Sequence, residues 1–438
     1  MLIMSIEKPA SIAYPTIGGS HADDGDSHYP APAIDERRCH RMLMQPRTDR
    51  VKMPRATSIG SACIAITLVL ASTGESLGGA QRARDLGVPF DGTPGPLNAI
   101  TDVPGLEVGQ TTLISGDGAA AVRTGVTVIL PQGKKWDVVF ASYFAGNGFG
   151  ELTGTSWVKE GGVLGGAIAI TNTWSVGTVR DAVLTWFDKS LRVGTPWHLP
   201  VVGETSDAYM NDIAGLHVRQ EHVWEALNGA SKGPVAEGDV GGGTGMVAFG
   251  FKGGIGSASR TLPGGYTLGV LVQANTGTRE LLTIAGAPVG KELPANEPND
   301  APPPPSRHDG GREGSIIVVV ATDAPLLPHQ LERLARRVPM GLARVGSTAA
   351  NGSGDIFIAF STANPGAAKA AGGPVDISML PNGDLDPFFL ATIQATEESI
   401  VNALVAAKTM TGIDGHTVYA LPHERLRELL RKYNRLAR

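Results

Sequence analysis

The sequence predicts an α+β fold in which β-sheets are stacked in the middle and helices cover the outside. Strand-like apolar runs group together along the chain, and amphipathic helical stretches lie between and after them. Glycine accounts for 58 of the 438 residues, almost twice its usual share of about 7%. Aromatic residues make up only 5%, so the composition is typical of a strand-rich chain with tight turns and close backbone approaches.

Five apolar runs predict strands. They comprise residues 125–130, 136–141, 266–272, 316–320 and 355–360. The run from Ile316 to Val320 contains only β-branched residues, which indicates a strand buried on both faces. Periodicity alone does not distinguish such a run from a segment of buried helix.

Four stretches have apolar residues at helical spacing and predict amphipathic helices. They comprise residues 179–186, 327–342, 390–408 and 423–436. In the second stretch, Leu331, Leu334 and Val338 recur at intervals of three and four residues. In the fourth, leucines occupy one face and arginines the other, so we expect the apolar faces of these helices to pack on the sheets.

The first 80 residues have the layout of an extension that the mature protein lacks. Residues 1–52 are polar and dotted with proline, and Met53 is a candidate initiator. A basic start then leads into the apolar run Ile59–Ala71 and a small-residue exit at residues 78–80, which is typical of a secretory signal. The apolar run is too short to span a bilayer. We therefore expect a periplasmic or secreted protein with no membrane attachment once mature; an uncleaved anchor or a disordered tail is the alternative.

Composition excludes several classes of chemistry from the mature chain. Both cysteines, Cys39 and Cys63, lie in the extension, so no thiol remains for catalysis, metal binding or disulfides. The net charge of −5 does not favour nucleic acid or an anionic membrane as a partner. The histidines show no His-Glu-x-x-His motif and no paired spacing with acids, so no metal site and no cofactor are expected.

The candidate reaction centre is the Gly314–Ser315 junction, where a polar segment meets the predicted strand 316–320. The preceding residues contain four consecutive prolines and no hydrophobic periodicity, so they cannot form a packed element. If the junction bond breaks, Ser315 becomes a chain terminus whose hydroxyl is a nucleophile and whose α-amine can act as its base. The alternative is an ordinary exposed linker before a core strand.

Two further polar clusters lie beside predicted strands. Ser353 and Asp355, two residues apart at the start of a strand, point to the same side and can address one site. The alternative is a glycine turn in which both side chains satisfy backbone donors. Asn275 follows another strand, and its carboxamide can stabilise an oxyanion or serve an ordinary turn before Gly277.

The glycine-rich loop at residues 241–245 resembles phosphate-binding loops but has no Walker lysine. Close backbone packing in a turn explains it better. A nucleotide-binding or non-catalytic structural protein built around this loop is nevertheless our second hypothesis for function.

Taken in order along the chain, these clusters resemble the L-aminopeptidase/D-esterase family that includes the β-peptidyl aminopeptidases, often called the DmpA family. The similarity covers essentially the whole mature chain and is carried by residues 84–95, 100–105, 201–205, 241–246, 314–315 and 351–355. It implies one catalytic domain, residues 81–438, with a four-layer αββα sandwich like that of ornithine acetyltransferase and the N-terminal-nucleophile hydrolases. It also implies self-cleavage into an α chain of residues 81–314 and a β chain of residues 315–438.

The same resemblance implies roles for individual residues. The nucleophile falls on Ser315, and its supporting groups are the hydroxyl of Ser353, the acid Asp355 and the oxyanion donors Asn275 and Tyr209, the last in preference to Tyr143. Relatives have glutamate where this chain has Asp355, which shortens the reach of that acid. For substrates with a free amino terminus, we choose Glu204 as the acid that meets the ammonium group.

The expected function is that of a self-processing aminopeptidase and amidase-esterase. It releases small amino-terminal residues of L, D or β configuration from peptides, amides and esters through an acyl-enzyme on Ser315. The resemblance also implies a homotetramer of processed αβ protomers. An acyl transferase like ornithine acetyltransferase is an enzymatic alternative, but that family uses threonine where this chain has Ser315.

Overall fold

The structure is a computed structural model that describes residues 81–135, 137–191, 199–293, 314–366 and 372–437. The predicted signal segment and the polar segment before Gly314 lie outside the described residues. So does Trp136, the first residue of one predicted strand.

The larger of the two main sheets has six strands, in the order β4-β3-β12-β11-β10-β9. These strands are β3 (Val138–Gly148), β4 (Val163–Gly165), β9 (Gly254–Thr261), β10 (Thr267–Ala274), β11 (Ile316–Thr322) and β12 (Gly354–Ser361). β11 and β12 run parallel, whereas the other neighbouring pairs are antiparallel. Four of the five predicted strands lie in this sheet and are confirmed.

The second sheet has four strands, in the order β1-β2-β5-β6. They are β1 (Glu107–Ser115), β2 (Val122–Lys134), β5 (Ile168–Thr171) and β6 (Val201–Glu204). The remaining predicted strand, residues 125–130, lies in β2 and is confirmed. Two short hairpins stand apart, one formed by β7 (Val247–Ala248) and β8 (Phe251–Lys252), the other by β13 (Met410–Thr411) and β14 (Thr417–Val418).

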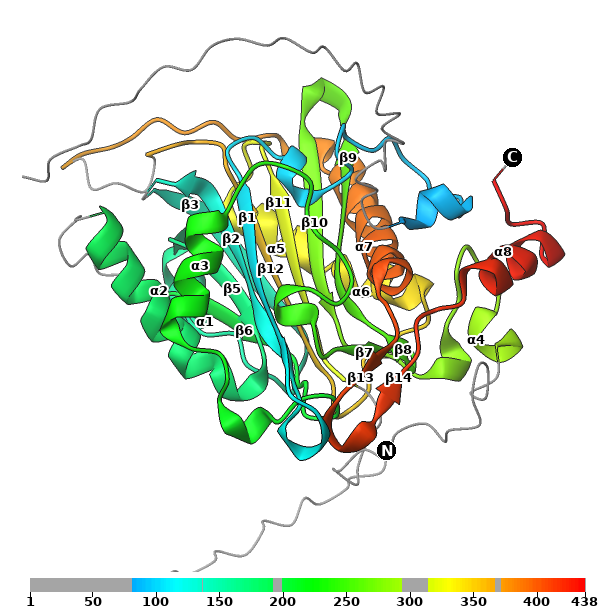
Figure 1. Cartoon of the computed structure of the whole chain (residues 1–438). Coiled ribbons are helices and arrows are strands. Elements are labelled where there is room, and N and C mark those ends of the chain that lie inside the picture. Colours follow the sequence, from blue (N-terminus) through cyan, green and yellow to red (C-terminus); the bar gives the residue numbers. More distant parts are fainter. Residues whose placement is uncertain (1–80, 136, 192–198, 294–313, 367–371, 438) are drawn as a thin grey trace, which may run out of the picture. The chain divides into compact units, whose positions relative to one another are not determined.

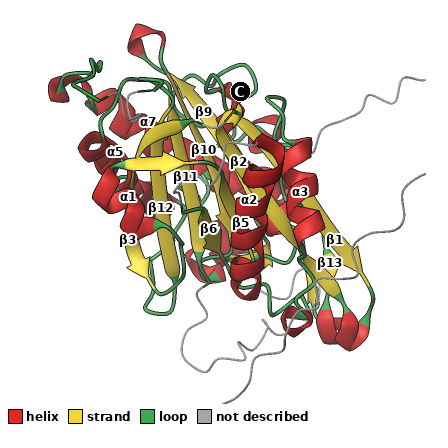
Figure 2. Ribbon diagram, turned by 90° about the vertical axis from the view of Figure 1, so that its left-hand side faces the viewer, coloured by secondary structure: helices red, strands yellow, loops and turns green. Residues whose placement is uncertain are grey.

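Helices cover both outer faces of the two sheets. The six-stranded sheet carries α5 (Pro328–Ala335), α6 (Val338–Arg344) and α7 (Asp386–Ala406), and the four-stranded sheet carries α2 (Val176–Leu191) and α3 (Gln220–Gly229). Figure 1 shows the strands between these two groups of helices, and Figure 2 shows the same layers at a right angle. Shorter or peripheral helices are α1 (Thr155–Gly161), α4 (Val289–Glu292) and α8 (His423–Lys432).

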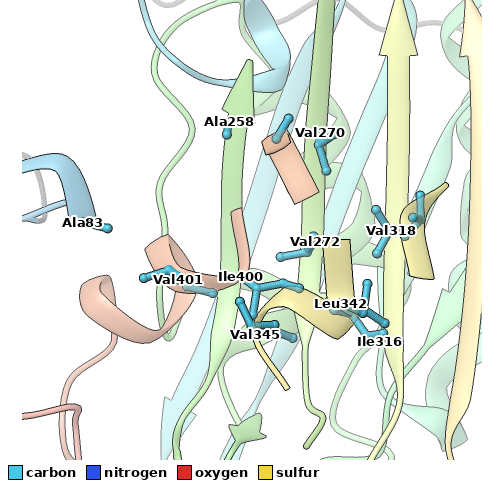
Figure 3. Packing of buried hydrophobic residues seen from close by; sticks show 14 of the residues in the cluster. Ala83, Ala258, Val270, Val272, Ile316, Val318, Leu342, Val345, Ile400 and Val401 are labelled. Carbon is cyan, nitrogen blue, oxygen red and sulfur yellow. The ribbon is translucent and has the colours of Figure 1, made fainter. Parts of the chain in front are cut away.

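Three hydrophobic clusters define the layers. Along β11, Ile316 and Val318 pack with the helices that cover the six-stranded sheet, whereas Ile317 and Val319 pack between the two sheets. Figure 3 shows Ile316 and Val318 beside Leu342 in the first of these clusters. The third cluster lies between the four-stranded sheet and α2 and α3. The order helix, sheet, sheet, helix confirms the αββα sandwich.

The strand predicted to be buried on both faces is confirmed, since every residue of β11 is buried. Each fully buried aliphatic side chain contributes about 1.5–3 kcal/mol to folding. A strand with such burial on both sides is a rigid support, and Ser315 is the residue immediately before it.

One helix prediction is wrong: residues 327–342 form two helices, α5 and α6, instead of one. Pro339 lies in the first turn of α6. Proline has no N–H to donate to the carbonyl four residues earlier, and its ring clashes with that carbonyl in a continuous helix. The apolar spacing nevertheless continues through the break, because both helices pack on the same core.

The sequence patterns considered above contain no signal for β9, because most of the buried residues of this strand are glycine, serine or alanine. A Cβ at Gly256 would collide with the carbonyl of Ser399 in α7, so glycine permits the helix to lie directly on the strand. Within the described parts of the chain, no helix has the length and apolar character that a membrane crossing requires.

Candidate active site

Strand register brings three of the predicted site residues together. β11 lies between β10, where Ala274 is opposite Ile316, and β12, where Asp355 is opposite Ile316. Ser315 comes one residue before Ile316. It is therefore flanked by Asn275, the residue after Ala274, on one side and by Gly354, the residue before Asp355, on the other. The junction therefore lies where β10 ends and where β11 and β12 begin.

The hydroxyl of Ser315 is half-buried and faces a backbone donor. The N–H of Gly354 donates to Ser315 Oγ over 3.1 Å. A Cβ at Gly354 would lie 2.9 Å from this Oγ and 2.8 Å from the Cα of Gly150, so only glycine fits without displacing them. The donor stabilises negative charge as it develops on the nucleophile.

Ser353 links the junction to a buried carboxylate. Its hydroxyl lies within hydrogen-bond distance of the carbonyl oxygen of Gly314 and 2.6 Å from Asp355 Oδ1. Ser353 and Asp355 are both buried, and their shared orientation confirms the prediction from their spacing. A serine hydroxyl has one hydrogen, so it donates to one of these two acceptors at a time.

The side-chain amide of Asn275 is held at both ends. Its Oδ1 accepts from the N–H of Val247 over 2.8 Å, and its Nδ2 donates to the carbonyl of Ser206 over 3.1 Å. These partners fix which end of the amide is the nitrogen. A Cβ at Gly314 would lie 2.7 Å from this Nδ2, so the amide nitrogen lies beside the junction.

Glu204, at the end of β6, lies on the other side of Gly354. Its Oε1 accepts from the N–H of Glu151 over 3.0 Å, and its Oε2 accepts from the hydroxyl of Thr173. A Cβ at Gly150 would lie 3.1 Å from this Oε1 and 3.1 Å from the Cα of Gly354. Gly150 therefore lies close to both the carboxylate and the residue that contacts Ser315.

Burial raises the pKa of Glu204, and the hydrogen bonds from Thr173 and the Glu151 N–H act in the opposite direction. A carboxylate in this state gains more from a cationic partner than an exposed one does, because less water competes for it.

The recorded contacts of the two candidate tyrosines involve residues other than Ser315 and Asn275. The ring of Tyr209 stacks on His416 with centroids 4.4 Å apart, and His416 Nδ1 lies 3.0 Å from the Tyr209 carbonyl oxygen. No hydrogen bond recorded among the described residues joins the Tyr209 hydroxyl to Ser315 or Asn275. Tyr143 is paired with Ile358, four residues along β12 from Gly354, which is roughly 13 Å at the usual rise per residue.

Three participants were not predicted: the Gly354 N–H, Gly150 and Thr173. Gly354 belongs to a recognised motif, but only strand pairing shows that its N–H faces Ser315. Gly150 and Thr173 are distant in sequence from the junction, and no local pattern marks them.

The glycine loop lies inside the sandwich. Gly241, Gly242 and Gly243 form a buried 3-10 turn. A Cβ at Gly242 would collide with Gln273 Oε1 and lie 2.6 Å from the carbonyl oxygen of Ile170. The turn is therefore packed between strands of both sheets, as close backbone approach predicts. In the part of the chain that is described, no group of three His, Cys, Asp or Glu residues is placed to hold a metal ion.

Comparison with known proteins shows that the chain matches a known family. Residues 98–418 match the model of Peptidase family S58. The β-peptidyl aminopeptidase BapA of Sphingosinicella microcystinivorans is 52% identical over 370 residues, which cover 81% of this chain and 93% of that protein. The protein of the same name from Sphingosinicella xenopeptidilytica is 47% identical over 385 residues, with 84% and 94% covered.

Solved structures agree. The L-aminopeptidase D-Ala-esterase/amidase of Ochrobactrum anthropi, described as a prototype of the serine aminopeptidases and a variant of the Ntn hydrolase fold, superposes with a TM-score of 0.75 at 45% identity. The match covers 81% of this chain and 99% of that one. A β-aminopeptidase from a Burkholderia species gives a TM-score of 0.74 at 47% identity, with 80% and 99% covered.

Proposed function

The chain belongs to peptidase family S58 and is a serine aminopeptidase of the N-terminal-nucleophile type, and we propose that it becomes active by cutting itself between Gly314 and Ser315. The observation that carries this proposal is the hydrogen bonding at the junction. The Ser315 hydroxyl receives a backbone N–H, while the carbonyl of the bond to be cut receives the Ser353 hydroxyl. The nucleophile oxygen and the carbonyl oxygen each accept a hydrogen bond, so negative charge that develops on either of them during attack is stabilised by a neighbouring donor.

Self-cleavage then proceeds in two balanced steps. Ser315 Oγ attacks the carbonyl carbon of Gly314, the C–N bond breaks, and the hydroxyl proton ends on the Ser315 nitrogen. The resulting ester joins Gly314 to the Ser315 side chain. Water hydrolyses this ester, leaving a carboxylate at Gly314 and a free amine and hydroxyl on Ser315.

The free amine completes the hydrolytic centre. An α-amine has an ordinary pKa of about 8, so part of it is neutral near neutral pH and can take the proton of its own hydroxyl. Before cleavage Ser353 faces a hydrogen-bond acceptor, the carbonyl of Gly314. After cleavage it faces a donor, the Ser315 amine. Ser353 can then accept from the amine while it donates to Asp355, and both residues hold the base in position.

Substrate hydrolysis repeats the same chemistry on an external carbonyl. Ser315 forms an acyl-enzyme, and water releases the acyl group. Asn275 stabilises the tetrahedral oxyanion, since its Nδ2 lies beside Gly314 and carries a hydrogen besides the one that Ser206 accepts. We assign small amino-terminal residues of L, D or β configuration as the groups released, in line with the names of the relatives.

Glu204 binds the substrate ammonium in this proposal. Its two carboxylate oxygens are oriented by Thr173 and Glu151, and the carboxylate lies one glycine away from Gly354. A free amino terminus held there would place the following carbonyl near Ser315, which explains exopeptidase action.

Glu204→Gln is expected to raise KM for alanine amides and to lower kcat/KM about 10- to 100-fold, because a hydrogen bond to a charged group contributes about 1.5–3 kcal/mol. The turnover number should change little, since the ammonium is bound equally in the ground and transition states. Steady-state kinetics measure both. Glu160→Gln is the matched control, because Glu160 is exposed and is not among the groups that act on the pKa of Glu204.

The pH profile gives a second test of Glu204. Binding an ammonium requires the ionised carboxylate, and burial raises its pKa above the ordinary 4.5. Protonation of the Ser315 amine lowers kcat/KM in both enzymes, and kcat/KM of the wild type should fall more steeply as the pH drops further through the raised pKa of Glu204; Glu204→Gln should lack this second acidic limb. If the variant shows the same second acidic limb as the wild type, a group other than Glu204 causes that limb.

Intact mass spectrometry of purified protein tests self-processing directly. We expect two chains, one ending at Gly314 and one beginning at Ser315, and a single chain across this bond would overturn the proposal. We also propose export to the periplasm or medium, supported by the signal-like layout of residues 1–80, so the α chain should begin near Gln81. Native mass should report the proposed tetramer of αβ protomers, for which the family resemblance is the support.

A further inference from the structure

Lys252, in the β7–β8 hairpin, is a fully buried lysine that the reaction described above does not use. It is among the largest side chains with no exposure to solvent. No ion pair within the described ranges joins it to a carboxylate. Placing an ammonium in the protein interior costs several kcal/mol, so its partners indicate what it contributes.

Those partners are backbone carbonyls of the glycine turn, of the segment that follows it and of the residue after Lys252. The ammonium donates to Met246 O over 2.8 Å, to Gly253 O over 2.9 Å and, with a longer contact, to Gly243 O over 3.4 Å. An ammonium has three hydrogens, and these carbonyls can accept all of them. Burial lowers the pKa of Lys252 to about 7, while the charge of Asp239 acts in the opposite direction; accepting carbonyls also favour the charged form.

The Met246 carbonyl belongs to the same peptide group as the Val247 N–H. Lys252 Nζ and the Gly253 N–H both donate to the oxygen of this group. Its N–H donates to Asn275 Oδ1 over 2.8 Å. One rigid peptide plane therefore lies between a buried cation and the amide that faces Gly314.

This chain of groups has an electrostatic consequence. A cation at the oxygen of a peptide polarises it and strengthens its N–H as a donor, and hydrogen bonds in series reinforce one another in a low-dielectric interior. A stronger donor at Oδ1 in turn withdraws charge from the Asn275 amide, so Nδ2 becomes a better donor. The same contacts fix the amide against rotation.

We propose that Lys252 is a positioning residue for the oxyanion site, acting through the 246–247 peptide to orient and polarise Asn275. This inference rests on the proposed role of Asn275. It also gives the glycine turn a function: Gly241 to Gly243 allow the loop to enter the sandwich, where the carbonyls of Gly243 and Met246 reach the ammonium.

The test compares Lys252→Met with the wild-type enzyme. Methionine retains most of the apolar stem and removes the charge and the donors. We expect kcat for alanine amides to fall about 10- to 100-fold, less than the roughly 100- to 1,000-fold loss on removing an oxyanion donor itself, with KM within about twofold. Affinity for a peptide boronate, whose tetrahedral adduct on Ser315 carries an oxygen in the oxyanion site, should fall by a similar factor, whereas affinity for a product amino acid should not change.

Lys134→Met is the matched control, because Lys134 donates to a backbone carbonyl at an exposed site, that of Asn228 over 2.7 Å. It should leave kcat and boronate affinity unchanged. Lys252→Gln retains neutral donors without the charge, so its kcat and boronate affinity should lie between those of Lys252→Met and the wild type. If circular dichroism shows that Lys252→Met is unfolded, Lys252→Gln alone provides the test. For a folded variant that cuts itself too slowly to give mature enzyme, the rate of chain cleavage replaces kcat, since Nδ2 lies beside Gly314.

Two outcomes separate this inference from the function on which it rests. If Asn275→Ala keeps its kcat, the oxyanion role of Asn275 is wrong and the inference falls with it. If Asn275→Ala loses activity while folded Lys252 variants keep both kcat and boronate affinity, only the role of Lys252 is wrong. A loss that affects substrate, product and boronate binding equally would indicate a merely structural lysine and also overturn the proposal.

Discussion

Ser315→Ala is expected to yield an uncut chain without hydrolytic activity. The hydroxyl is the attacking group in both self-cleavage and substrate hydrolysis, so alanine removes the nucleophile from both. Loss of a catalytic nucleophile lowers kcat by factors of about 10⁶ in a comparable serine hydrolase, so activity on alanine amides should fall below detection. Denaturing electrophoresis and intact mass measure the first effect, and steady-state rates measure the second.

Ser206→Ala is a suitable control for this variant. Its side chain is exposed, and its contact with Asn275 is made by the backbone carbonyl, which alanine retains. It should process and turn over like the wild type. A Ser315→Ala chain that still separates between residues 314 and 315 would show that another group attacks the junction, and the assignment of the nucleophile would have to be abandoned.

Asn275→Ala has the second-largest expected effect, a decrease in kcat of about 100- to 1,000-fold with little change in KM. Removing one oxyanion donor has this magnitude because the interaction is made only in the transition state. The N–H of Val247 also loses its acceptor, so thermal melting should accompany the kinetics. Slower chain cleavage is expected as well, since Nδ2 lies beside Gly314.

Thr278→Ala provides a comparison on the same segment. Thr278 is half-buried and lies three residues beyond Asn275. Its variant should retain kcat. If Asn275→Ala melts like the wild type and turns over at an undiminished rate, the oxyanion is stabilised elsewhere, and the Gly354 N–H becomes the first group to test.

The strand β11 could be predicted from the sequence because its burial on both faces requires β-branched residues at every position from Ile316 to Val320. The same reasoning failed for β9, most of whose buried positions hold glycine, serine or alanine. The helix predicted at residues 327–342 also shows the limit of apolar spacing, since the pattern persists where Pro339 ends hydrogen bonding.

In the candidate site, too, some contacts could be predicted from the sequence and others could not. Ser353 and Asp355 could be paired from their spacing, because alternate residues of a strand share a face. No local sequence pattern indicates that Asn275 and Glu204 lie near Ser315. These positions depend on the register of β10 against β11 and on Gly150, which brings the end of β6 close to Gly354. The tyrosine at the oxyanion site was assigned by resemblance alone, and Tyr209 instead stacks on His416.

By itself, the sequence determined the fold class, the central strand and the serine at its start, since these follow from residue types read locally. Only the tertiary structure decided which backbone N–H faces that serine, which groups orient the Glu204 carboxylate and how a buried lysine reaches the Asn275 amide. Those arrangements join residues far apart in the chain. They exist because two sheets pack face to face, and packing of this kind depends on the whole set of side chains and not on any one segment.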